Sequence, residues 1–254
     1  MKYAQALKPV FDHYDAKLRV VDNLCKKVAS GDYTGLNISG PPGIGKTTLV
    51  TALLAKYKTG SHYVVKGRSL TPLGLYTLLH KYSNRGDVVV FDDADIKDLD
   101  TINLLKAACD TTAGPRLVSY EVSSVHRLGL QPNFMYSGSI VILTNRALAD
   151  EKKLVNHLKA LVDRCKAVEL AAFDGGSTFK LIAYMLYRHD ILKQYNFTDE
   201  VKDELLEYIA DNQAIMKTVS LRTLEKLADY KRDFGDDWAM FAEATLLTTH
   251  GDDA

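Results

Sequence analysis

The pattern of apolar and polar positions changes near residue 171. Before that point, short apolar runs alternate with segments of helical period. Two of these runs, Val88–Phe91 and Ile140–Leu143, are apolar at every position, which is typical of parallel strands covered on both faces. The pattern predicts strands at 36–39, 62–66, 87–92, 139–144 and 166–170, and helices at 46–58, 71–83, 99–110 and 151–163. We therefore expect an α/β fold with a parallel sheet flanked by helices.

After about residue 171, the apolar positions recur only with the period of a helix. The segment Phe173–Ser177 contains two glycines and a serine and is expected to interrupt regular structure. Beyond it, the pattern predicts helices at about 178–195, 198–211, 218–232 and 236–247, and residues 3–29 are predicted to form one or two amphipathic helices. This division predicts an α/β domain over residues 1–172 and a small all-helical domain over residues 173–254.

A glycine-rich loop lies between the first predicted strand and the helix after it. It fits the pattern G-x-x-x-x-G-K-[ST], in which backbone N–H groups and the positive end of a helix surround phosphate oxygens. Lys46 is expected to reach the β- and γ-phosphates, and Thr47 to hold Mg²⁺ through its hydroxyl. The alternative, a chance match in a Gly/Pro turn, does not explain the flanking strand and helix. The predicted nucleotide-binding residues are Gly40, Pro41, Pro42, Gly43, Ile44, Gly45, Lys46, Thr47 and Thr48.

Two further predicted strands end in polar side chains. Val88–Phe91 is followed by Asp92 and Asp93, and Ile140–Leu143 by Thr144 and Asn145. We assign Asp92 to Mg²⁺ and Asp93 to the attacking water. Asn145 would reach the γ-phosphate if its strand lies between the phosphate-loop strand and the acidic strand. Solvated turns are the alternative for all three side chains.

Composition limits the other functions of the chain. Lys+Arg and Asp+Glu each number 32, so the net charge is zero, and a nucleic-acid contact would require a local patch or an assembly. Cys25, Cys109 and Cys165 have no metal-binding spacing and fit a reducing cytosol. The N-terminus does not resemble a signal peptide, and no apolar run reaches the roughly 18 residues of a membrane span. We expect a cytoplasmic location, in the host cytoplasm if the chain is viral.

These motifs together resemble the AAA+ P-loop ATPase superfamily over most of residues 15–230. The resemblance implies ATP and Mg²⁺ as cofactors, a nucleotide-binding domain over 1–172 and a helical lid over 173–254. It places Asn145 at the sensor 1 position, Arg164 at that of an arginine finger and Arg222 at sensor 2. A finger acts on a neighbouring subunit, so the resemblance also implies a homo-oligomer such as a hexameric ring.

Three of these assignments have alternatives or depart from the family pattern. The family usually has Asp-Glu where this chain has Asp92 and Asp93, and a shorter carboxylate reaches less far toward water. Arg164 could instead cap the end of the preceding helix, where a cation is favourable. Arg222 could be a solvated helix residue.

The segment before Asn145 resembles the pre-sensor-1 hairpin of ring-forming members. Residues 116–122 alternate like a strand, and His126 and Arg127 follow in an expected loop. The order of parts is similar to viral superfamily 3 helicases and to AAA+ ATPases of tailed bacteriophages. Arg116, His126 and Arg127 are therefore candidate nucleic-acid contacts, and a basic loop without a function is the alternative.

The resemblance implies an oligomeric ATP hydrolase that couples hydrolysis to nucleic-acid remodelling, as a helicase, translocase or helicase loader in phage DNA replication or processing. An ATPase that remodels or assembles a partner protein without DNA is the alternative. A monomeric nucleotide switch or kinase is a third interpretation.

Overall fold

The computed structural model describes most of the chain as two compact units. The described residues are residue 3 and residues 6–57, 60–67, 70–93, 96, 98–111, 114–145, 155–170 and 178–248. The sheet unit comprises residues 18–41 and 46–171, and the helical unit comprises residues 1–17, 42–45 and 172–254. The long helix α2 (Lys8–Ala29) contributes to both units. The Phe173–Ser177 segment, and with it the predicted domain boundary, lies outside the described residues.

A five-stranded parallel sheet forms the centre of the sheet unit. Its strand order is β2-β3-β6-β1-β7, with β1 pairing in parallel with both β6 and β7. The strands are β1 (Gly35–Ser39), β2 (His62–Lys66), β3 (Val88–Asp92), β6 (Ser139–Thr144) and β7 (Lys166–Glu169). The order confirms the predicted parallel sheet and places β6 between the phosphate-loop strand β1 and the acidic strand β3.

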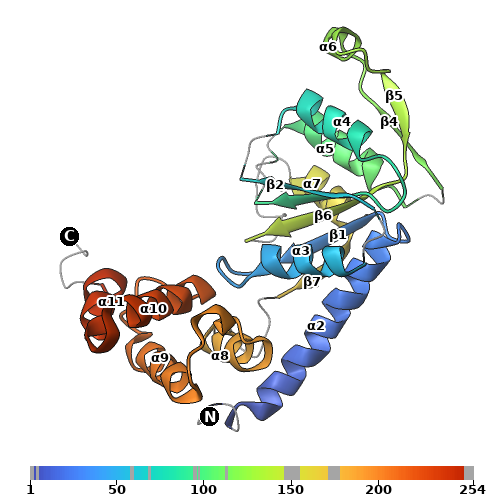
Figure 1. The fold of residues 1–254 in the computed structure, drawn as a ribbon. Coiled ribbons are helices and arrows are strands. Elements are labelled where there is room, and N and C mark those ends of the chain that lie inside the picture. The colour runs from blue at the N-terminus through green and yellow to red at the C-terminus, as the bar shows by residue number, and fades with distance from the viewer. Residues whose placement is uncertain are drawn as a thin grey trace. The chain divides into compact units, whose positions relative to one another are not determined.

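Helices cover the two faces of this sheet (Figure 1). The helices between its strands are α3 (Lys46–Tyr57), α4 (Pro72–Lys81), α5 (Leu99–Ala108) and α7 (Val155–Val162). Alternate residues of β3 and β6, such as Phe91 and Ile142, join one apolar core with side chains of α4, α5 and α7. Because both faces are covered, β3 and β6 are buried along almost their whole length. The predicted helix at 151–163 is described from residue 155 onward.

Between α5 and β6 the chain forms a two-stranded antiparallel hairpin that is separate from the central sheet. It consists of β4 (Arg116–Ser119), the short helix α6 (Ser123–Arg127) and β5 (Asn133–Tyr136). In Figure 1 the α6 end of the hairpin extends away from the central sheet. Its position before β6 agrees with the hairpin expected from the sequence.

The helical unit has the helices predicted for the C-terminal part of the chain, with adjusted ends. They are α8 (Thr178–His189), α9 (Asp199–Asn212), α10 (Leu221–Phe234) and α11 (Trp238–Leu246), with 3₁₀ turns at Lys193–Tyr195 and Gly235–Asp237. The predicted helix at 178–195 ends early because Asp190 adopts φ +45°. The helix expected from residue 218 begins at Leu221, since the Ser220 side chain caps it by accepting the Thr223 N–H.

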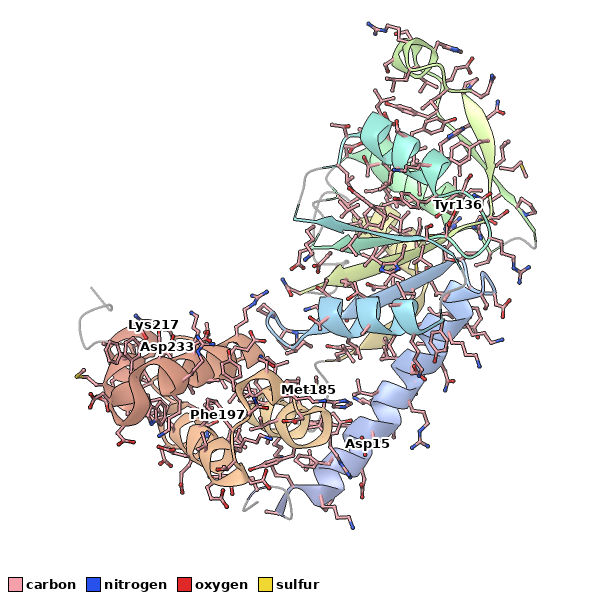
Figure 2. The ribbon with its side chains drawn as sticks, in the orientation of Figure 1. Asp15, Tyr136, Met185, Phe197, Lys217 and Asp233 are labelled. Atoms are coloured by element: carbon pink, nitrogen blue, oxygen red, sulfur yellow. The ribbon has the colours of Figure 1, made fainter. Side chains whose placement is uncertain are left out.

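Aromatic packing joins α2 to α8 within the helical unit. Tyr184 is buried, and its ring meets the rings of Phe11 and Tyr14 edge-on at 5.5 and 5.0 Å. Its hydroxyl donates to the carboxylate of Asp15, which Figure 2 labels on α2. These contacts are apolar packing with a satisfied polar tip.

None of the helices in the described residues has the length and apolar character needed to cross a bilayer.

Candidate functional site

The glycine-rich loop connects the end of β1 to the start of α3. The Gly40 N–H donates to the carbonyl of Thr144 at 3.1 Å, which fixes the loop beside the end of β6. Gly43 and Gly45 have φ of +73° and +80°, a region that costs other residues about 1–2 kcal/mol. Thr48 is exposed in the first turn of α3. The two glycines therefore give the loop a backbone that residues with a Cβ adopt only at a cost, and phosphate binding by this loop stays a prediction.

Lys46 is the buried cation of this site. Its side chain is only 6% exposed, and Nζ donates to the carbonyl oxygens of Gly40 and Pro41 and to Oδ1 of Asn145, each at 2.8 Å. A charged ammonium is tolerated in a buried position when acceptors surround it. The ammonium group of Lys46 therefore lies against the loop. The motif predicts that this same group binds phosphate.

Thr47 and Asp92 form the candidate Mg²⁺ site. The Thr47 hydroxyl donates to Oδ2 of Asp92 at 2.8 Å. One carboxylate and one hydroxyl match the hard oxygen ligands of Mg²⁺, which usually completes its shell with water and substrate phosphate. The donor set therefore fits the predicted metal.

Asn145 connects the buried lysine to the second carboxylate. Its Nδ2 donates to Oδ2 of Asp93 at 2.7 Å, while its Oδ1 accepts from Lys46. Asp93 has φ +49° and its N–H donates to the Leu143 carbonyl at 3.1 Å. A left-handed Asp is uncommon, and such backbone positions concentrate at functional sites. The structure thus brings Lys46, Asn145 and Asp93 into one hydrogen-bonded chain at the carboxyl edge of the sheet.

Residues 42–45 of the glycine-rich loop belong to the helical unit, as does the start of α10. The Leu221 N–H donates to the Gly43 carbonyl at 3.0 Å. A Cβ at Gly43 would lie 2.8 Å from Cβ of Ser220, and one at Gly45 would lie 3.3 Å from Leu221. Arg222, the predicted sensor 2 residue, is exposed directly after this contact. Sequence reasoning missed Ser220 and Leu221 because no local pattern signals a contact between segments so far apart.

Arg164 lies in the turn between α7 and β7. Its side chain is half-buried, and Nη1 donates to the Ala160 carbonyl at 2.6 Å. This contact agrees with the alternative in which Arg164 caps the end of the preceding helix. The action of Arg164 on a neighbouring copy stays a prediction.

Arg116 was predicted as a candidate nucleic-acid contact, but the structure places this side chain in the interior. Arg116 is 7% exposed; its guanidinium lies 5.1 Å from the ring centroid of Tyr136 and donates to the Gly138 carbonyl. Burial lowers the pKa of the guanidinium. In strand β4 the side chains alternate, so Arg116 shares the buried face with Val118. Figure 2 labels its neighbour Tyr136 in the hairpin.

His126 and Arg127 are exposed on α6, as expected of a surface contact. Exposure alone does not assign them a ligand.

The fold is similar to solved structures of nucleic-acid motors and initiators. A point mutant of RuvB from Thermotoga maritima has a TM-score of 0.55 at 16% identity, covering 92% of this chain and 68% of that one. A second structure, described as the Thermotoga maritima RuvB Holliday junction branch migration motor, has a TM-score of 0.50 at 16% identity. The match covers 89% of this chain and 67% of that one. The replication initiator DnaA bound to AMPPCP and single-stranded DNA gives 0.51 at 16% identity, with 89% of this chain and 64% of DnaA covered.

No protein-family model and no curated protein matches the sequence. At such low identity the similarity to solved structures concerns the fold alone. The chain therefore shares the fold of these RuvB and DnaA structures, a parallel sheet flanked by helices and followed by a C-terminal helical region.

Proposed function

We propose that this protein is a Mg²⁺-dependent ATP hydrolase that works as an oligomer on nucleic acid. The observation that carries the proposal is the hydrogen-bonded chain Lys46–Asn145–Asp93 beside the Thr47–Asp92 pair. A lysine under a glycine-rich loop, a hydroxyl–carboxylate pair and a second carboxylate are the groups that phosphoryl transfer to water requires.

Each group has a distinct role in this proposal. Lys46 and the loop N–H groups bind the β- and γ-phosphates, and Thr47 and Asp92 hold Mg²⁺, which supplies positive charge to the phosphate oxygens. Asp93 and Asn145 orient the attacking water, and Asp93 accepts its proton. Because Asp93 is shorter than the usual glutamate, its carboxylate depends on the unusual backbone angle and on Asn145 for its position.

We further propose that Arg164 completes the site of a neighbouring copy and that Arg222 contributes from α10. Two inactive variants test the first part. Lys46→Ala keeps Arg164 but loses its own phosphate ligand, whereas Arg164→Ala keeps the phosphate site but loses the finger. If the finger acts on a neighbour, mixing the two variants restores ATP turnover, because some shared sites then contain both residues. A mixture as inactive as its components argues for action within one chain.

The nucleic-acid role rests on the hairpin and on the similar structures. RuvB is described as a Holliday junction motor and DnaA was solved with single-stranded DNA. His126 and Arg127 are exposed at the α6 end of the hairpin. Repeated in each copy of an oligomer, these side chains would contact a phosphate backbone although the chain has no net charge. A helicase, translocase or loader in phage DNA replication or processing is the specific form of this proposal.

The test is ATP turnover with and without single- and double-stranded DNA at several salt concentrations. We expect DNA to stimulate turnover and His126→Ala/Arg127→Ala to abolish the stimulation. The matched control is His62→Ala/Lys66→Ala, which removes one histidine and one cation from the exposed positions of β2. Turnover that ignores DNA at every salt concentration contradicts the nucleic-acid role but not the ATPase.

One observation favours remodelling of a protein partner as a second candidate function. Leu117 and Met135 lie directly opposite each other in the hairpin and are 59% and 55% exposed, and Leu128 beyond α6 is 56% exposed. Exposed apolar side chains gathered on one element are typical of protein contacts. Stimulation of turnover by an unfolded model polypeptide but not by DNA, lost in Leu117→Ser/Met135→Ser, would favour this function.

A further inference from the structure

Two of the three cysteines lie together in the core of the sheet unit. Cys109 is the C-terminal cap of α5, and Cys165 lies between α7 and β7. Both sulfur atoms abut Gly35 at the start of β1: a Cβ there would lie 2.6 Å from Sγ of Cys165 and 3.2 Å from Sγ of Cys109. Residues far apart in sequence thus place two thiols side by side where only a glycine leaves room for them.

The surroundings make the two thiols unequal. The neighbouring Cys165 thiol, together with burial, raises the pKa of Cys109 well above its usual value. The neighbouring Cys109 thiol and the charge of Arg164 lower the pKa of Cys165, against the opposing effect of burial. Cys165 is also the more accessible of the two, at 8% exposed against 0%. A thiol of lowered pKa near a cation is the one that reacts.

Cys25 provides an internal comparison. It is fully buried on α2, and burial, together with the nearby Asp22, raises its pKa to about 12. It therefore has the properties of an inert structural thiol.

We propose that Cys109 and Cys165 are a modification site: an oxidisable pair whose two sulfur atoms form a reversible disulfide when hydrogen peroxide is the oxidant. The Cys165 thiolate attacks one peroxide oxygen, the O–O bond breaks, and hydroxide leaves and takes up a proton, which leaves a sulfenic acid on Cys165. The Cys109 sulfur then attacks the Cys165 sulfur, the S–O bond breaks, and water leaves with the Cys109 proton. Two thiols lose two electrons in total, and one hydroperoxide is reduced to two waters when the oxidant is hydrogen peroxide.

The disulfide would join the end of α5 to the turn that carries Arg164. Arg164 immediately precedes Cys165 and is hydrogen-bonded to Ala160 of α7. A covalent link at the next residue restrains the turn, and hence the range of positions that the Arg164 guanidinium can reach. This consequence for turnover rests on the proposed role of Arg164, whereas the chemistry of the pair does not.

The chemistry is tested by peptide mapping without nucleotide. The protein is treated with hydrogen peroxide, unfolded in N-ethylmaleimide and digested with trypsin without reduction. We expect a disulfide-linked species that joins the peptides 107–116 and 165–166, with a mass two hydrogens below the sum of the two free peptides. The Cys25 peptide, residues 20–26, should carry an N-ethylmaleimide adduct. Dithiothreitol should reverse the link. Cys109 and Cys165 both still alkylated, or Cys25 oxidised as fast as they are, would overturn the proposal.

Variants test the order of the two steps. Cys109→Ser should leave a sulfenic acid on Cys165 that dimedone traps, whereas Cys165→Ser should leave Cys109 unreacted. The opposite pattern would overturn the assignment of Cys165 as the attacking thiol. Cys25→Ser is the matched control and should form the disulfide at the wild-type rate.

ATP turnover then tests the consequence for Arg164. We expect turnover to be lost in proportion to the cross-linked fraction and recovered with dithiothreitol, and Cys25→Ser to respond like the wild type. Full turnover in fully cross-linked protein would overturn the link to Arg164. A protein without any turnover would contradict the proposed function instead, and the peptide map would still decide whether the pair is oxidisable.

Discussion

The contact between Gly43 and Ser220 allows the geometry of the phosphate loop to be tested as a free energy. Alanine at residue 43 meets two costs. The positive φ of +73° costs a residue with a Cβ about 1–2 kcal/mol, and a Cβ 2.8 Å from Cβ of Ser220 adds about 1–3 kcal/mol for overpacking. We therefore expect Gly43→Ala to lower the free energy of unfolding by about 2–5 kcal/mol and to weaken ATP binding.

A double-mutant cycle separates the two costs. Ser220→Gly removes the clashing atom, and glycine in place of an N-cap serine costs only a few tenths of a kcal/mol. In the Ser220→Gly background, Gly43→Ala should cost only the backbone strain, so the coupling energy should be about 1–3 kcal/mol. The single tryptophan of the chain, Trp238, is buried in α11 of the same unit and reports its unfolding in urea. An equal cost of Gly43→Ala in both backgrounds would refute the reasoning.

Three further predictions concern the sheet unit. Thr47→Ala and Asp92→Ala should both abolish the difference between ATP affinities measured with Mg²⁺ and with EDTA, because their oxygens are the proposed metal ligands. Asp93→Asn should retain ATP binding but lose about 10²–10⁴-fold in turnover, the usual contribution of a general base; unchanged turnover would exclude Asp93 from that role. The pKa of Cys25 rises from 9.0 to about 12 on folding, so the unfolded chain releases this proton first and stability should fall as pH rises from 9 toward 12. Urea titrations across this range should show a smaller fall for Cys25→Ala.

The residues of the candidate phosphate site could be predicted from sequence because each part of the site is a local pattern. The glycine-rich loop, the acidic strand end and the Asn145 strand each form a continuous pattern, and the parallel order β3-β6-β1 brings their ends together. Asn145 contacts both Lys46 and Asp93, as its predicted position between loop and carboxylates required.

Other features depend on contacts that a linear pattern does not contain. Arg116 was predicted as a candidate nucleic-acid contact, yet it shares one face of β4 with the buried Val118. The contact of Ser220 with Gly43 joins distant segments and leaves no local signal. The pairing of Cys109 with Cys165 is of the same kind, because scattered cysteines with no metal spacing give no indication of which ones meet in the fold.

The most direct test of the account is ATP binding and turnover by Lys46→Ala beside Lys56→Ala. Both lysines lie on α3, but Lys46 is buried under the loop whereas Lys56 forms an exposed ion pair with Asp22. We predict that Lys46→Ala loses turnover and binds ATP much more weakly, while Lys56→Ala behaves like the wild type. Full ATP turnover by Lys46→Ala would contradict the assignment of this loop as the phosphate site.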